Sequence, residues 1–293
     1  MIPGSFDYVS ANSLSEAIAL LGQYGDDAKI LAGGHSLIPL LRYRLAAPAV
    51  LVDINHIDEL EYMQETDGIL HIGALTREAE LDRSPLIRTR YPILYDTARN
   101  IADPVVRNWA SVGGNLAHAD PANDHPATML ALGASVVAEG PAGQRVIQMD
   151  EFFTDITFET TLLPGEILTE IRVPAPGERS GGAYCKLERK VGDYAIAGVA
   201  AYVQLDASGL VTSAGIGLTN VGPVPLKARA AEQSLRGKSL DEQNIREAAD
   251  MAEAASQPTS DTRGPAEYKR AMVHTLCVRA LKKAAQRAQG GGA

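Results

Sequence analysis

Two short glycine-rich segments contain the residues best suited to hold a ligand. The segments AGGHSL (32–37) and SVGGN (111–115) each place paired glycines where an apolar stretch gives way to polar residues. Because glycine has no Cβ, the backbone can turn sharply there and its N–H groups can approach a bound molecule closely. Successive N–H groups in such a turn form a concavity that binds anions such as phosphate. One such segment alone is usually a tight turn, but two of them indicate a ligand with two linked phosphates held between them.

The usual nucleotide-binding fingerprints are incomplete in this chain. The segment GIGLTN (215–220) begins like the dinucleotide-binding G-x-G-x-x-G pattern, but it has Asn220 at the last position and opens no helix. The segment GKS (237–239) resembles the end of a P-loop, but Glu232 stands where that loop requires a glycine. We interpret both segments as surface turns.

The segment HADPANDH (118–125) has two interpretations. Its acidic and imidazole side chains, those of His118, Asp120, Asp124 and His125, form a set that could ligate a metal. The segment directly follows the second glycine pair and contains Pro121, which favours a loop wrapped around the same ligand. Short Asp and Asn side chains in such a loop can accept hydrogen bonds from ribose or ribityl hydroxyls.

The segment RKVGDYA (189–195) joins cations, a glycine, Asp193 and Tyr194 between two predicted strands. Taken alone, such a stretch is typical of a hairpin turn with a solvated aspartate. Alternatively, a tyrosine at the tip of a loop can lie flat on an aromatic cofactor.

Length and composition limit the classes of function. The 293 residues allow two domains, and 45% hydrophobic with 22% charged residues is a globular composition. A net charge of −9 argues against a nucleic-acid partner. The two cysteines, Cys185 and Cys277, cannot supply the four thiolates of an iron–sulfur cluster. No secretory signal and no apolar run of transmembrane length is visible, so we expect a cytosolic protein.

The expected elements place both glycine pairs within an α/β region. Residues 1–55 predict β-α-β, with Ser13 and Glu16 as a capping box, and the strand 28–31 leads into the first pair. From residue 60 to residue 176 we expect both strands and helices. The second glycine pair, Gly113-Gly114, is expected to form a turn in the middle of this region. The Pro- and Gly-rich stretch 173–182 is the best linker. Three strands and then three helices follow it, which is typical of an α+β domain.

These motifs resemble those of a known family. The chain resembles the FAD-binding medium subunit of molybdenum hydroxylases, most closely of the aerobic carbon monoxide dehydrogenase type. The resemblance covers nearly the whole chain and rests on these segments in order: MIPGSFDY, AGGHSLIP, SVGGN, NDHPA, PGEILTEIRVP, KLERKVGDYA, GLTNV and SDTRGPAEYKRAM.

The resemblance implies a fold and a division into domains. It implies the α+β class, with a vanillyl-alcohol-oxidase-like (PCMH-type) FAD-binding domain over residues 1–176. That domain would consist of two α/β subdomains, at about 1–56 and 57–176. A C-terminal α+β domain, a three-stranded sheet plus helices, would cover 177–288.

The resemblance also implies a set of residues that bind FAD non-covalently, and no catalytic or metal-binding residue in this chain. The pyrophosphate would lie against the first loop and the second, where Ser-Val replaces the more common Thr-Ile. Asp124 would bond the hydroxyl or phosphate side, Leu168 and Lys186 would flank the cofactor, and Tyr194 would cover the isoalloxazine beside Asp193. The loop residues are Ala32, Gly33, Gly34, His35, Ser36, Leu37, Ser111, Val112, Gly113, Gly114 and Asn115.

The implied function is electron transfer within a larger enzyme. A large subunit would hold molybdopterin, a small subunit would hold two [2Fe–2S] clusters, and the complex would be a dimer of heterotrimers. It would be cytoplasmic, with peripheral attachment to the inner membrane as an alternative. The expected substrate is carbon monoxide, with an N-heterocycle or aldehyde as the alternative. Two other classes stay open: a stand-alone flavin oxidase of the same fold, with His35 covalently attached to the flavin, and a nucleotide-binding regulatory protein without redox chemistry.

Overall fold

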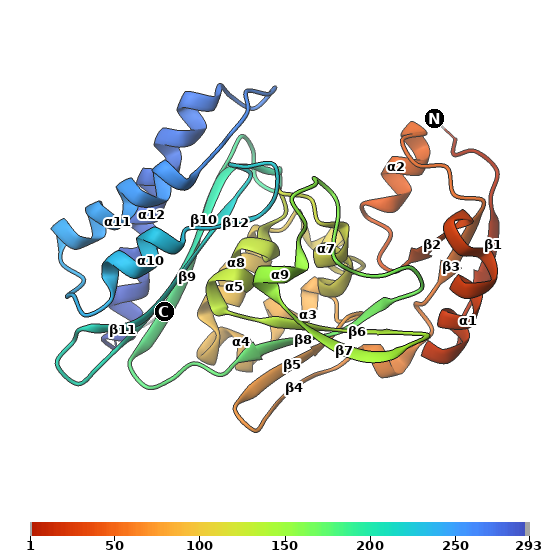
Figure 1. The fold of residues 1–293 in the computed structure, drawn as a ribbon, viewed down its shortest axis with the longest axis horizontal. Helices are drawn as coiled ribbons and strands as arrows, with labels where there is room; N and C mark the ends of the chain where they lie inside the picture. Colours follow the sequence, from red (N-terminus) through yellow and green to blue (C-terminus); the bar gives the residue numbers. More distant parts are fainter. Residues whose placement is uncertain (1, 291–293) are drawn as a thin grey trace.

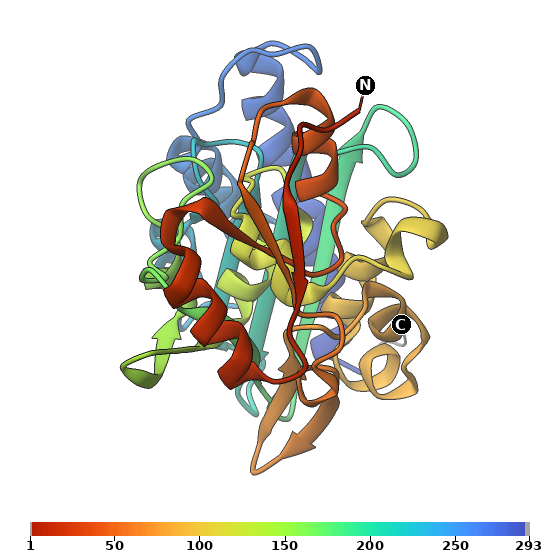
Figure 2. The same ribbon diagram turned by 90° about the vertical axis from the view of Figure 1, so that its right-hand side faces the viewer.

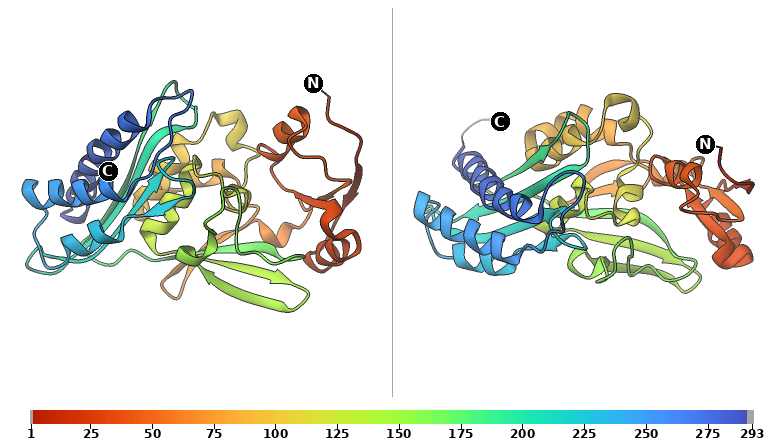
Figure 3. Two further views of the ribbon diagram at one scale, coloured as in Figure 1. Left: turned by 45° about the horizontal axis from the view of Figure 1, so that its top comes forward. Right: turned by 90° about the horizontal axis from the view of Figure 1, so that it is seen from above.

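Three β-sheets follow one another along the long axis of the molecule (Figures 1 and 3). The computed structural model describes residues 2–290, so Met1 and residues 291–293 lie outside the description. The N-terminal part lies at one end, and the C-terminal sheet with its helices lies at the other. None of the described helices combines the length and the apolar character needed to cross a membrane.

The N-terminal part is a small parallel sheet with two helices (Figure 2). Its elements are β1 (Asp7–Ser10), α1 (Leu14–Tyr24), β2 (Ala28–Leu31), α2 (Leu37–Tyr43) and β3 (Val50–Asp53), and the strand order is β1-β3-β2. As the capping box predicts, Ser13 Oγ accepts the N–H of Glu16 at 3.2 Å. The helix continues past Gly22 to Tyr24, where Gly25 follows at φ +54°. Parallel pairing puts the carboxyl ends of β2 and β3 at one sheet edge, where the first glycine pair begins.

The middle part is a five-stranded antiparallel sheet in the order β4-β5-β8-β6-β7, with helices packed on one face (Figure 1). Apolar side chains of strands and helices form its core, among them Ile72, Leu116, Met129 and Ile171. The strands are β4 (Met63–Thr66), β5 (Ile69–Gly73), β6 (Ser135–Gly140), β7 (Gly143–Gln148) and β8 (Ile167–Pro174). The helices are α3 (Glu78–Arg83), α4 (Pro85–Arg90), α5 (Pro92–Asn100), α6 (Pro104–Arg107), α7 (Val112–His118), α8 (Asp124–Leu132) and α9 (Met149–Phe152).

The C-terminal part is a four-stranded antiparallel sheet, and helices cover both of its faces. The strands are β9 (Ser180–Glu188), β10 (Ala195–Leu205), β11 (Val211–Thr219) and β12 (Leu226–Lys227), and the helices are α10 (Arg229–Leu235), α11 (Glu242–Ala255) and α12 (Ala266–Ala288). The sequence predicts three strands and a helix over 225–235. The fourth strand arises because Leu226 and Lys227 pair with Leu218 and Gly217 of β11 before α10 begins.

Helix α8 of the middle part packs closely on this sheet. A Cβ at Gly215 or Gly217 of β11 would overlap the carbonyl oxygens of Ala131 and Ala127. Glycine is therefore required at both positions for the backbones to approach this closely. The contact also fixes the start of α8, where Asp124 lies, against the C-terminal sheet.

Candidate functional site

The first glycine pair leaves a series of backbone donors without protein partners. The chain leaves β2 at Leu31 and turns through Gly33 and Gly34 before α2 begins. Gly34 has φ +75°, a conformation that glycine adopts at no steric cost. Within residues 2–290, the N–H groups of Gly33, Gly34, His35 and Ser36 donate no hydrogen bond to the protein. Successive free N–H groups of this kind fit a phosphate.

The second glycine pair is not the turn that the sequence predicts, because Gly113 and Gly114 lie in the first turn of α7. Most of its N–H groups are already bonded. Those of Val112 and Gly113 donate to the carbonyls of Thr76 and Ala74, both at 3.0 Å. That of Asn115 closes the first helical bond on Ser111. In the described chain, the N–H groups of Ser111 and Gly114 are left without a partner in this segment. The second segment therefore offers two separated backbone donors rather than a continuous series.

Two buried side-chain atoms beside Gly114 also lack partners. Within residues 2–290, no hydrogen bond satisfies Ser111 Oγ or Asn115 Oδ1. Buried polar atoms are nearly always hydrogen-bonded, to protein, water or a ligand. Gly114 itself is exposed, and a Cβ there would meet only Ser111 Oγ at 2.7 Å and Ala32 Cβ at 3.9 Å. The Gly114 N–H and the Ser111 hydroxyl can donate to a phosphate group, and Asn115 Oδ1 can accept from a hydroxyl of the same ligand.

The two glycine segments are in direct contact. A Cβ at Gly33 would overlap the carbonyl oxygen of Trp109 and would lie 2.9 Å from the Cα of Ala110. The free donors of the first segment and those around Gly114 therefore border one common region, as a ligand with two linked phosphates requires.

Arg77 links the two segments, and the sequence analysis missed it. Its Nη1 donates to the carbonyl of Trp109 at 2.8 Å, and its Nη2 donates to Asn55 Oδ1 at 2.9 Å. Asn55 Nδ2 in turn donates to the carbonyl of Ala32 at 2.8 Å. Asp53 Oδ1 orients Asn55 by accepting its backbone N–H and its amide. Both Asn55 and Arg77 closely follow strands, β3 and β5, and that position is the signal that was available in the sequence.

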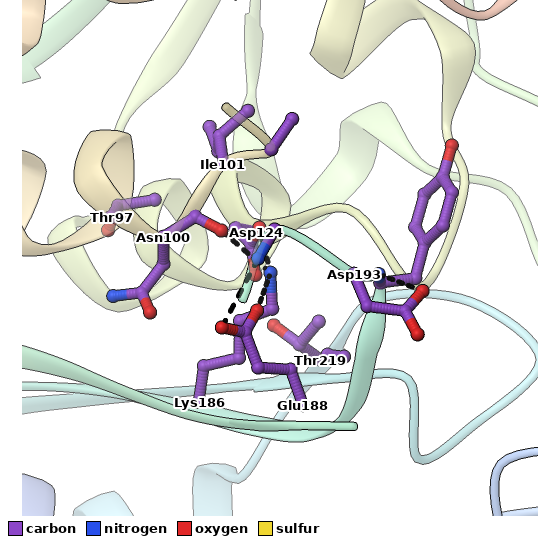
Figure 4. Close-up of polar contacts among 12 residues, drawn as sticks. Thr97, Asn100, Ile101, Asp124, Lys186, Glu188, Asp193 and Thr219 are labelled. Atoms are coloured by element: carbon purple, nitrogen blue, oxygen red, sulfur yellow. Dashed lines mark hydrogen bonds and ion pairs between the residues drawn. The ribbon is translucent and has the colours of Figure 1, made fainter. Parts of the chain in front are cut away.

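Asp124 and Lys186 meet at the junction between the middle part and the C-terminal sheet (Figure 4). Asp124 Oδ2 lies 3.0 Å from Lys186 Nζ, and Asp124 Oδ1 accepts the hydroxyl of Tyr184 at 2.5 Å. Lys186 also donates to the carbonyl of Asn100 at 2.8 Å and lies 3.4 Å from Glu188. Burial raises the pKa of Asp124, and the Lys186 ammonium opposes that shift.

Both carboxylate oxygens of Asp124 thus already accept hydrogen bonds from protein groups, Tyr184 and Lys186. A carboxylate accepts about four hydrogen bonds, so one to a cofactor hydroxyl is still compatible with this arrangement. Leu168 lies in β8 with its side chain packed in the core of the middle part. The contacts of Asp124, Leu168 and Lys186 with a cofactor remain predictions.

Tyr194 and Asp193 lie at the end of the β9–β10 hairpin. Asp193 is not the solvated residue of a simple turn, because its side chain is only 10% exposed and pairs with Arg263 at 3.0 Å. The same Oδ1 atom accepts the N–H of Tyr194 at 2.9 Å. Arg263 lowers the pKa of Asp193 chiefly by this hydrogen bond. The Tyr194 side chain is 43% exposed, and burial of its remainder raises its pKa.

The four side chains of the alternative metal site have separate partners. Asp120 accepts the N–H of Ala122, Asp124 pairs with Lys186, and the buried His125 bonds to Glu78. His118 packs on Phe158, with ring centroids 5.4 Å apart. Among the described residues, no three His, Cys, Asp or Glu side chains gather in a way that could hold a metal ion. His35, the candidate for covalent attachment, is exposed on its turn.

Two family models match the chain. Residues 4–176 match the FAD binding domain in molybdopterin dehydrogenase, and residues 182–284 match the CO dehydrogenase flavoprotein C-terminal domain.

Similar proteins match along nearly the whole chain. A carbon monoxide dehydrogenase medium chain of Hydrogenophaga pseudoflava is 45% identical over 97% of this chain and 98% of its own. The alpha subunit of the 6-hydroxypseudooxynicotine dehydrogenase complex of Paenarthrobacter nicotinovorans is 41% identical over 99% of this chain and 97% of its own.

Solved structures agree. A chain of the carbon monoxide dehydrogenase of H. pseudoflava superposes with a TM-score of 0.95 and 47% identity, over 98% of this chain and 99% of its own. A chain of quinoline 2-oxidoreductase from Pseudomonas putida 86 gives 0.90 and 33% identity, over 99% of both chains. These matches confirm the α+β class, with an FAD-binding domain followed by a C-terminal domain.

Proposed function

The chain belongs to the family of FAD-binding subunits of molybdopterin dehydrogenases, and we propose that it is the flavin subunit of an aerobic carbon monoxide dehydrogenase. The observation that carries the proposal at the level of the site is the contact between the two glycine segments. That contact brings the free N–H groups after β2 next to the free N–H of Gly114. The choice of carbon monoxide as substrate is supported by two relatives that are named carbon monoxide dehydrogenase medium chain and are 45% and 44% identical to this chain.

FAD would supply two-electron redox chemistry, and the protein groups would bind and orient it. In this proposal the N–H groups of residues 33–36 and of Gly114 hold the pyrophosphate, and the Ser111 hydroxyl donates to it. Asn115 Oδ1 accepts a hydrogen bond from a hydroxyl of the cofactor. Asp124 and Lys186 lie on the side of α8 and β9, where they would flank the ribityl or flavin end. Tyr194 would cover the isoalloxazine and keep water from it.

Electrons would reach the flavin from another chain. The two cysteines are too few to ligate two [2Fe–2S] clusters, so the clusters would belong to a small partner subunit and the molybdopterin centre to a large one. Because the flavin would receive its electrons from another chain, that chain would have to dock on this one. We expect a heterotrimer, duplicated about a two-fold axis. We place the complex in the cytoplasm, and peripheral attachment to the inner membrane is the alternative.

The substrate of the complex depends on the large subunit. Similar chains belong to enzymes named for other substrates, including glyceraldehyde dehydrogenase and caffeine dehydrogenase. An aldehyde or N-heterocycle hydroxylase is therefore the second candidate. A stand-alone flavin oxidase is the candidate of another class.

Purification of the native complex tests the proposal. We expect three kinds of chain, FAD that is released by acid or heat, and oxidation of carbon monoxide with a dye as electron acceptor. If the complex oxidises an aldehyde or N-heterocycle but not carbon monoxide, the proposed substrate is wrong and the proposed flavin subunit still stands. A lone active chain with flavin that survives denaturation would favour the oxidase.

A further inference from the structure

The segment between α11 and α12 forms an anchored turn that has no role in the proposed cofactor contacts. Asp261 accepts the N–H groups of Arg263 at 2.8 Å and Gly264 at 3.2 Å. Its other oxygen lies 2.7 Å from the Nζ of Lys269, whose side chain is 2% exposed. Ser260 Oγ accepts the N–H of Ala266 at 2.9 Å and so caps the start of α12. The turn is therefore fixed at the base of Arg263.

Arg263 extends from this turn to the hairpin that carries Tyr194. Its Nη2 donates to Asp193 Oδ1 at 3.0 Å, and its guanidinium carbon lies 5.5 Å from the centroid of the Tyr194 ring. Asp193 Oδ1 also accepts the backbone N–H of Tyr194. One guanidinium thus contacts the ring directly and holds the backbone of the same residue through a carboxylate.

The hairpin is also held from the opposite side. Gly192 has φ +83°, and a Cβ there would lie 2.8 Å from the carbonyl oxygen of Ala102. With Gly192 against the middle part and Asp193 against Arg263, the backbone leading to Tyr194 has little freedom. The remaining freedom is rotation of the half-exposed ring, and the guanidinium over that ring restricts it.

We propose that Arg263 is a positioning residue that sets the orientation of the Tyr194 ring over the flavin. This inference rests on the proposed function, because it takes the isoalloxazine to lie against Tyr194. Arginine suits the task because its planar group can bond a carboxylate at its edge while its face lies on an aromatic ring. A lysine can form the ion pair with Asp193, but it has no planar group to stack on the ring.

Arg263→Lys therefore separates positioning from stability. We expect the holoenzyme with R263K to keep its FAD content and its melting temperature close to those of the wild type. The rate at which oxygen reoxidises the reduced flavin should change by about two- to fivefold, in the same direction as in Y194A. The matched control is R246K, which changes an exposed arginine of α11 whose ion-pair partner is Glu242 of the same helix, at 2.8 Å.

Two comparisons decide the outcome. In the double variant R263K/Y194A, the reoxidation rate should equal that of Y194A alone, because Arg263 acts through the tyrosine ring. A rate like that of the wild type in R263K, with a changed rate in Y194A, would overturn the inference and leave the flavin role intact. Unchanged reoxidation rates in both R263K and Y194A would mean that Tyr194 does not contact the flavin, and the inference would then be wrong. Loss of FAD from R263K would also overturn it, because Arg263 would then be needed for binding.

Discussion

Gly33 and Trp109 touch so closely that no side chain fits between them. The Cβ of any other residue at Gly33 would overlap the carbonyl oxygen of Trp109, which Arg77 also holds by a hydrogen bond of 2.8 Å. The contact joins the N-terminal part to the middle part at the point where the two glycine segments meet. The spacing of the two segments therefore depends on the absence of a single carbon atom.

Gly33→Ala is expected to push the two segments apart. Because both must contact one pyrophosphate, we expect FAD affinity to fall by at least about tenfold, the equivalent of about 1.4 kcal/mol. The measurement is fluorescence titration of the FAD-free chain with FAD. Gly22→Ala is the matched control, because Gly22 lies in α1 and a Cβ there meets nothing within 4 Å. Equal affinities of the two variants would mean that the contact is unimportant for the cofactor.

Gly114→Val tests the second segment in a different way. A Cβ at Gly114 would lie 2.7 Å from Ser111 Oγ and would meet nothing else closer than Ala32 Cβ at 3.9 Å. Because the Ser111 hydroxyl can rotate away, the variant should fold with nearly normal stability. The branched side chain should block the approach of the cofactor to the free N–H of Gly114, and the protein should be purified without flavin. Normal visible flavin absorbance at normal yield would show that the cofactor does not approach Gly114.

The sequence predicted the fold well where local signals were strong. The strands and helices that lead into Gly33, the hairpin before Tyr194 and the cap at Ser13 follow from apolar runs, turn residues and a capping box, which are short-range features. Strand β12 was missed because two residues paired to β11 carry no periodic pattern. The helical start at Gly113 was missed because paired glycines are poor helix formers. The turn is supported by bonds from Val112 and Gly113 to Thr76 and Ala74, which lie outside the helix.

The candidate site was predicted less completely than the fold. Glycine pairs can be recognised along the chain. The hydrogen bonds by which Asn55 and Arg77 link the two glycine segments depend on contacts between residues that are far apart in the sequence. Such contacts have no signature in a single sequence. The ion pair of Asp124 with Lys186 was hidden for the same reason, although both residues were singled out.

Ser111→Ala should separate cofactor binding from stability. Ser111 Oγ is buried and has no partner in the described chain, so its removal costs the FAD-free protein no hydrogen bond. If the hydroxyl bonds FAD, its loss should weaken binding by about 1 kcal/mol, a factor of about five. FAD titration and urea unfolding of the FAD-free chain give the two quantities. A large loss of stability with unchanged FAD affinity would instead make Ser111 a structural residue.

Glu78 and His125 form a fully buried pair, with Glu78 Oε2 and His125 Nε2 2.7 Å apart. The pair ties the start of α3 to the start of α8, next to Arg77 and Asp124 respectively. Glu78→Ala would leave the buried imidazole nitrogen without its hydrogen-bond partner, which typically costs about 1–3 kcal/mol. Urea unfolding measures the loss. Glu80→Ala in the same helix is the control, because Glu80 forms only an exposed pair with Arg83, and it should cost under about 1 kcal/mol.

The ion pair of Asp193 with Arg263 should make stability depend on pH in the acid range. Arg263 lowers the pKa of Asp193 below its ordinary value of 3.8. The unfolded chain therefore binds a proton at a higher pH than the folded chain does, and stability falls as the pH drops through this interval. Asp193→Asn removes the titrating group. The difference in unfolding free energy between wild type and D193N should be constant above about pH 5 and should shrink toward about pH 3. A difference that stays constant down to that pH would mean that Arg263 does not lower the pKa of Asp193 in the folded chain.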